Sequence, residues 1–157
     1  MSVLTSQIAK QLRDTYFGGN WTWVNFKDTL QNVTCQDAVK KVGSLNTIAA
    51  LVYHTGYYIT GVMQKLQGGE LSIKDKYAFD HPVIDSEDSW NRLVDTAYAN
   101  ARQFADVIEQ LPESKLWEIF EEEKYGNLYR NLTGIIEHLH YHLGQIVLIK
   151  KLIAENK

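Results

Sequence analysis

Hydrophobic residues recur at helical spacing at the start of the chain. Ile8, Leu12 and Tyr16 stand four residues apart, and charged side chains occupy positions between them. This pattern predicts an amphipathic helix over residues 4–16. The glycine pair at positions 18–19 follows directly and predicts the end of that helix.

A short helix and then a long one are predicted next. After an aromatic-rich connection, NWTWVNF, Thr34 and Asp37 have the spacing of a capping-box relative, which predicts a short helix over residues 34–42. Ser44 is a good N-cap residue. It predicts the start of a second long helix that continues to about Leu66.

The second long helix is unusual because residues 42–64 contain no Asp, Glu, Lys or Arg. Such a run raises the question of a membrane span. Polar residues interrupt it, however, and we therefore predict a helix that is buried on more than one side. One face comprises Leu45, Ile48, Ala49, Val52, Ile59 and Met63, and the opposite face comprises Leu51, His54, Tyr58 and Gly61. The second face needs a partner: another helix, another subunit or a cavity that holds a ligand.

Two more long helices are predicted in the second half of the chain. A connection of about 17 residues, GELSIKDKYAFDHPVID, precedes a third helix that starts near Ser86 and ends before Pro112. The segment Trp117–Arg130 is ambiguous, with short strand-like or irregular structure expected around its glycine. The last helix is predicted from about Leu128 to Ala154. We therefore expect one all-α domain over residues 1–157, a bundle of four long helices with long connections after the first and second.

Composition and charge narrow the functional classes. The chain is 45% hydrophobic and 22% charged, with a formal net charge of −3 and no run of Lys or Arg. This balance argues against nucleic acid as a partner. Cys35 is the only cysteine, and the N-terminal residues lack the layout of a signal peptide. We therefore expect a protein of the reducing cytoplasm that does not span a membrane, and we expect Cys35 to be structural.

Candidate chemistry is concentrated in IIEHLHYHLGQI, which holds three of the five histidines. His138 and His142 are four residues apart, so their imidazoles lie on one side of a helix, whereas His140 points away. Two histidines at this spacing can each offer a nitrogen to one metal ion. A zincin protease is not expected, because Leu139 stands where the catalytic glutamate of HExxH would be.

His54 is the natural third ligand. It lies in the middle of the uncharged helix among tyrosines, where a histidine needs a partner for its ring nitrogens. Spacing alone leaves two alternatives open: a three-histidine metal site, or a His54 that bonds a tyrosine hydroxyl or a backbone carbonyl. His81 precedes Pro82 in a predicted loop and is expected to be a surface residue.

These residues carry a family resemblance. LVYHTGYY in the second helix together with HLHYHLGQI in the fourth resembles the DinB-like, or YfiT-like, superfamily of bacterial four-helix bundles. GNWTWVNFKDTL, GSLNTIAALVYH and DSEDSW are similar to other parts of that pattern, so the resemblance extends over nearly the whole chain. It implies an up-down-down-up bundle with a long crossover, a homodimer, and a divalent metal ion, zinc or nickel, held by His54, His138 and His142.

Three neutral imidazoles leave a bound ion its full charge and at least one exchangeable position, as in catalytic zinc sites. The resemblance implies a metal-dependent enzyme, either a transferase that attaches a low-molecular-weight thiol to a small electrophile or a hydrolase. The alternatives are a bundle that the ion merely stabilises, and a stress-related protein without enzymatic activity. Gln145 lies about one turn from His142 and could orient its imidazole or a ligand.

Overall fold

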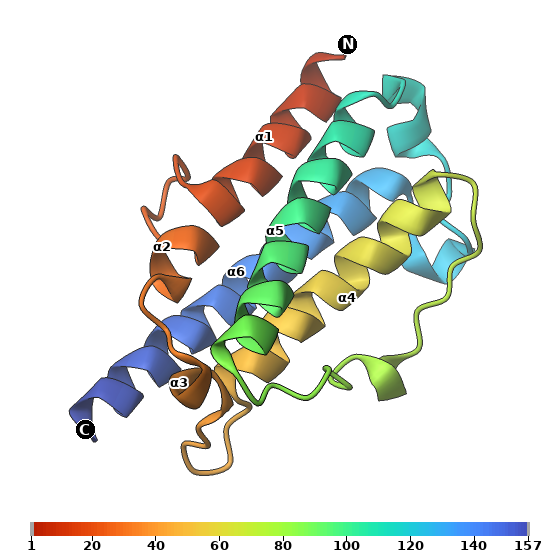
Figure 1. Cartoon of the computed structure of the whole chain (residues 1–157). Coiled ribbons are helices and arrows are strands. Elements are labelled where there is room, and N and C mark those ends of the chain that lie inside the picture. The colour runs from red at the N-terminus through yellow and green to blue at the C-terminus, as the bar shows by residue number, and fades with distance from the viewer. Residues whose placement is uncertain (1, 157) are drawn as a thin grey trace.

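The computed structural model describes residues 2–156 and is all-helical over that range, so the predicted fold class is confirmed at this level (Figure 1). Four long helices occur where the apolar periodicity predicts them. The elements in chain order are α1 (Val3–Phe17), α2 (Phe26–Leu30), α3 (Cys35–Val39), α4 (Ile48–Leu66), the 3-10 turn η1 (Asp75–Tyr77), α5 (Glu87–Glu109), the 3-10 turns η2 (Glu113–Trp117) and η3 (Glu123–Tyr125), and α6 (Leu128–Glu155).

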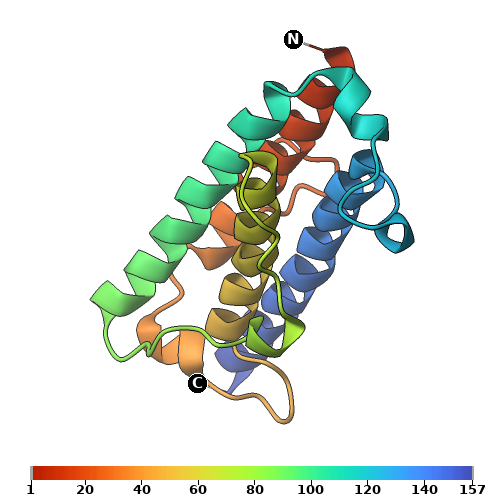
Figure 2. The same ribbon diagram turned by 90° about the vertical axis from the view of Figure 1, so that its right-hand side faces the viewer.

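The long helices pack against one another in pairs: α1 and α4 each contact both α5 and α6. Figures 1 and 2 show that α1 and α6 run in one direction along the molecule, while α4 and α5 run in the other. Because α4 and α5 are parallel, residues 67–86 must return along the length of α4 before α5 begins. This connection crosses the molecule on the side where α4 and α6 lie next to each other (Figure 2).

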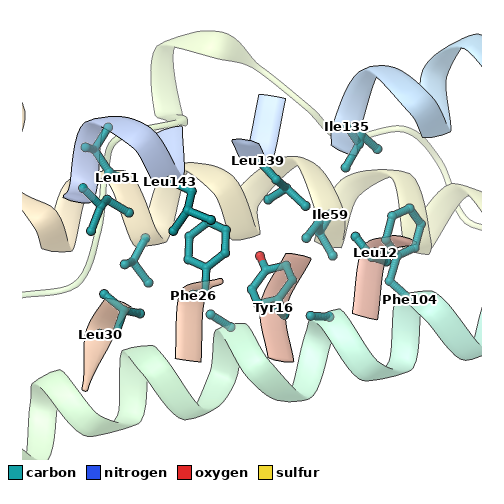
Figure 3. Close-up of a cluster of buried hydrophobic side chains, with 14 of the residues drawn as sticks. Leu12, Tyr16, Phe26, Leu30, Leu51, Ile59, Phe104, Ile135, Leu139 and Leu143 are labelled. Atoms are coloured by element: carbon teal, nitrogen blue, oxygen red, sulfur yellow. The ribbon is translucent and has the colours of Figure 1, made fainter. Parts of the chain in front are cut away.

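Apolar side chains from the long helices meet in one core (Figure 3). Tyr16 of α1 stacks on Phe26 of α2 with ring centroids 4.6 Å apart, and both rings are almost completely buried. Their removal from water contributes to folding in proportion to the apolar area covered. The core also contains Leu12, Leu30, Leu51, Ile59, Phe104, Ile135, Leu139 and Leu143.

N-cap hydrogen bonds define where α3, α4 and α5 begin, and one of them corrects the predicted start of α4. Thr34 and Ser86 cap α3 and α5 as predicted, through bonds from backbone N–H groups to their side-chain oxygens. The start of the second long helix was predicted wrongly at Ser44. Thr47 is the N-cap instead: its Oγ1 accepts a hydrogen bond from the N–H of Ala50 at 3.1 Å. Leu45, predicted for the core face, therefore precedes α4 and is 40% exposed.

Two further segments refine the prediction. The aromatic-rich connection contains a helix that the pattern did not predict, α2, which Asn25 caps by accepting from the N–H of Asp28 at 2.9 Å. The ambiguous segment before α6 is irregular as expected: it comprises two 3-10 turns and an isolated antiparallel bridge between Ile119 and Asn127.

Both sides of α4 are buried, as its uncharged sequence predicts, and the chain itself covers the second side. Ile73 of the connection lies directly over Gly61: a Cβ at position 61 would stand 2.3 Å from Ile73 Cγ1. Tyr57 Oη donates to the carbonyl of Lys74 at 3.1 Å and accepts from its N–H at 2.9 Å. No second subunit is needed to bury this face. Among residues 2–156, no helix combines the length and hydrophobicity that crossing a membrane requires.

Candidate metal centre

The packing of α4 against α6 brings together the three histidines that the sequence singles out. Nε2 of His138 lies 3.0 Å from Nε2 of His54 and 3.0 Å from Nε2 of His142. One potential ligand atom from each residue lies within 4.8 Å of the others. His140 points away, as predicted, and its Nε2 lies 3.2 Å from Thr15 Oγ1 on α1.

Hydrogen bonds at Nδ1 of His54 and at Nδ1 of His142 fix which nitrogen of each ring carries the proton. His54 Nδ1 lies 3.1 Å from the carbonyl oxygen of Ala78, which can only accept, so Nδ1 is the donor and Nε2 keeps a free lone pair. His142 Nδ1 lies 2.7 Å from Oε1 of Gln145 and donates to it in the same way. Metal-bound histidines in proteins are oriented by this kind of bond. The predicted role of Gln145 therefore agrees with the geometry.

The surroundings keep all three imidazoles neutral. Burial lowers the pKa of His54 and of His142. Burial, and then the proximity of His142 and His54, lower the pKa of His138 to about 4. Only a neutral imidazole can offer a lone pair to a metal ion. At neutral pH the cluster therefore presents the protonation state that ligation requires.

Two of the three separations between the ring nitrogens fit ligation of one divalent ion. Two nitrogens bound to the same ion at about 2.0–2.1 Å lie about 2.8–3.4 Å apart when the coordination angle is between about 90° and 109°. The two 3.0 Å separations from His138 Nε2 lie within this range, and the ligand atoms of His54 and His142 lie within 4.8 Å of each other. These two separations also fit a cluster in which His138 donates an Nε2–H to one neighbour. No fourth His, Cys, Asp or Glu joins the group within the part of the chain that the structure describes.

Aromatic side chains hold the imidazoles in place. Phe79 stacks on His54 with centroids 4.0 Å apart and an interplanar angle of 7°. Tyr58 packs edge-on against His54 and His138, 5.2 Å from each. Burial raises the pKa of Tyr58 to about 12, so its hydroxyl stays protonated and donates to Asp75 Oδ1 at 3.0 Å.

The connection supplies three of these contacts, through Asp75, Ala78 and Phe79. Sequence reasoning missed all three residues, because no periodic pattern indicates where an irregular segment lies against a helix. The run AFD before His81-Pro82 carries no signal beyond its aromatic residue. The shell around His54 is therefore a property of the tertiary fold.

A pocket of about 740 Å³ opens next to the cluster. Tyr58 and His138 form one end of its lining, and the rest comes from α4, the connection, the irregular segment before α6 and the first half of α6. A pocket of this size takes a small organic molecule. An ion held by the three histidines would therefore lie at the edge of a space that a substrate can enter.

Two other candidate residues lie away from the cluster. His81 is partly exposed and its Nδ1 lies 2.7 Å from the carbonyl of Pro82. Cys35 is buried at the start of α3, where burial raises the pKa of its thiol. A raised pKa disfavours the reactive thiolate, in agreement with a structural role.

Comparison of the chain with protein-family models, with curated proteins and with solved structures gave no significant match. The resemblance to the DinB-like superfamily therefore stays a prediction that is carried by the motifs in the sequence.

Proposed function

We propose that the protein is a divalent-metal-binding member of the DinB-like, or YfiT-like, superfamily with an up-down-down-up four-helix bundle. Support comes from the opposed directions of α1 and α6 relative to α4 and α5, and from the long return of residues 67–86 between two parallel helices (Figures 1 and 2). The paired-histidine motif HLHYHLGQI lies in the fourth long helix, where that superfamily carries it.

The observation that carries the metal proposal is the convergence of three Nε2 atoms beside an open pocket. His54, His138 and His142 are the proposed ligands. Zinc and nickel are the proposed ions, since both accept imidazole nitrogen. The outer bonds to Ala78 and Gln145 set two of the imidazoles in the tautomer that ligation needs.

We further propose a metal-dependent enzyme, of the thiol transferase or hydrolase class. When bound, the ion would supply a Lewis acid that activates a water or a low-molecular-weight thiol. The pocket would admit the small electrophilic substrate beside His138. Tyr58 keeps its proton at neutral pH and donates it to Asp75, so its hydroxyl oxygen can accept a hydrogen bond from a ligand at this end of the pocket.

Cobalt substitution tests this proposal. Protein stripped with a chelator and loaded with Co²⁺ should show a visible absorption band that shifts when free imidazole is added, because an exchangeable coordination position is open. If the protein binds Co²⁺ but its absorption band does not shift when imidazole is added, the result would instead support the alternative, in which the ion only joins α4 to α6.

A homodimer also belongs to the proposal. Because the connection covers the second face of α4, the dimer would use another surface.

A further inference from the structure

The floor of the pocket is a straight stripe along α6. Arg130, Gly134 and His138 follow one another at intervals of four residues, so they lie on one side of the helix, and all three line the pocket. Gly134 adds no side chain, and a Cβ built there would meet nothing within 4 Å. An open trough therefore extends from the histidine cluster to Arg130, roughly 12 Å along the helix axis at about 1.5 Å per residue.

Arg130 places a fixed positive charge at the far end of this trough. Its Nη1 donates to the carbonyl of Tyr125 at 2.9 Å, which ties the guanidinium to the turn before α6. None of the ion pairs within residues 2–156 involves Arg130. The remaining guanidinium N–H groups are therefore available to a ligand, and a planar guanidinium matches a carboxylate in two parallel hydrogen bonds.

Two carboxylates line the end of the pocket at the histidines. Glu137 is exposed, lines the pocket and directly precedes His138. Asp75 also lines it and is held by Tyr58, whose ring packs on His138. With a divalent ion bound, these two carboxylates balance its double charge, so this end accepts a neutral head group that offers a lone pair to the ion, and Arg130 is the cation that remains for a carboxylate. The pocket therefore has a defined polarity along its length.

From this arrangement we infer that the pocket binds an elongated organic anion, with a neutral metal-binding head at His138 and a carboxylate tail at Arg130. This inference rests on the proposed function, because the head group needs the ion. It adds a specificity-determining residue, Arg130, and it sets the length and orientation of the ligand. Gly134 keeps the path between the two ends open.

Matched probes on the cobalt-loaded protein test the inference. The probes are imidazoles that carry a hexanoate or a hexanol chain on one ring nitrogen, and a short analogue that carries propanoate. Calorimetry gives the affinity and the cobalt absorption band reports ligation. The hexanoate should bind about tenfold more tightly than the hexanol, as one charge-assisted hydrogen bond to Arg130 provides. The propanoate should show no such gain, because it cannot reach Arg130.

Two variants separate recognition from folding. Arg130→Gln should remove the preference for hexanoate and leave the hexanol affinity unchanged, which shows that the pocket is intact. Gly134→Leu should exclude both long probes and still admit free imidazole. Equal binding of hexanoate and hexanol to the unaltered protein would overturn the inference alone. If the absorption band of the cobalt-loaded protein does not shift when free imidazole is added, both the inference and the enzymatic proposal would be overturned.

Discussion

Ile73 of the connection packs directly against Gly61 of α4, and replacement of this glycine by alanine tests that packing. The added methyl would stand 2.3 Å from Ile73 Cγ1 and 2.8 Å from Cδ1. Carbon atoms in contact are normally about 3.5–4.0 Å apart. Either the Ile73 side chain or the connection must therefore move by more than about 1 Å. The same connection carries Ala78 and Phe79, which hold His54.

Gly56 on the same helix provides a matched control, because a Cβ there would meet nothing within 4 Å. Alanine in place of a helical glycine gains up to about 1 kcal/mol. Gly56→Ala should show this gain. Gly61→Ala should lose about 1–3 kcal/mol relative to Gly56→Ala, the usual cost of overpacking a well-packed site. Urea unfolding followed by circular dichroism, in the presence of a chelator, measures the difference.

A second substitution identifies the partner. In a double-mutant cycle, Gly61→Ala combined with Ile73→Ala should be more stable than the sum of the two single effects, because the smaller side chain removes the clash. If Gly61→Ala proved as stabilising as Gly56→Ala, the connection would not lie over α4 as described. The contacts that surround His54 would then lose their structural basis.

Further predictions concern the histidines. His54→Ala should abolish stoichiometric metal by elemental analysis, whereas His140→Ala should retain it, because His140 contacts α1 instead; loss in both would contradict the face assignment. Gln145→Ala should weaken zinc binding about 10–100-fold in a chelator competition, since His142 loses its orienting acceptor. The metal-free protein should lose stability as the pH falls from 7 towards 5, because the folded state keeps His138 neutral, with a pKa near 4, while the unfolded state takes up the proton. His138→Gln should flatten this dependence in urea titrations at each pH, and an unchanged slope would argue against a depressed pKa.

The sequence allows much of the helical architecture to be predicted, for physical reasons that particular residues show. The four-residue recurrence of Ile8, Leu12 and Tyr16 reflects a helix with one buried side, and α1 has that form. His138 and His142 could be paired from spacing, because both lie on one helix. His54 was harder to place, since its partner helix is far away in sequence. Its assignment depended on the resemblance, and the packing of α4 on α6 brings it to the other two.

The parts that could not be predicted depend on competition between similar local signals or on tertiary contacts. Ser44 and Thr47 are both good N-cap residues, and the sequence does not show that Thr47 is the one that accepts the hydrogen bond from the N–H of Ala50. The course of residues 67–86 over α4 is set by the fit of Ile73 on Gly61, which no periodicity reveals. The pocket polarity likewise requires Arg130 and Asp75, which are distant in sequence, to line one space.

Metal analysis of protein purified without any immobilised-metal column tests the central claim most directly. The protein should contain, or take up from a zinc titration after chelator treatment, one equivalent of divalent metal per chain. His142→Ala should contain none. A protein that remains metal-free, and whose thermal stability does not change with excess zinc, would contradict the claim. The three converging imidazoles would then be a hydrogen-bonded cluster between α4 and α6.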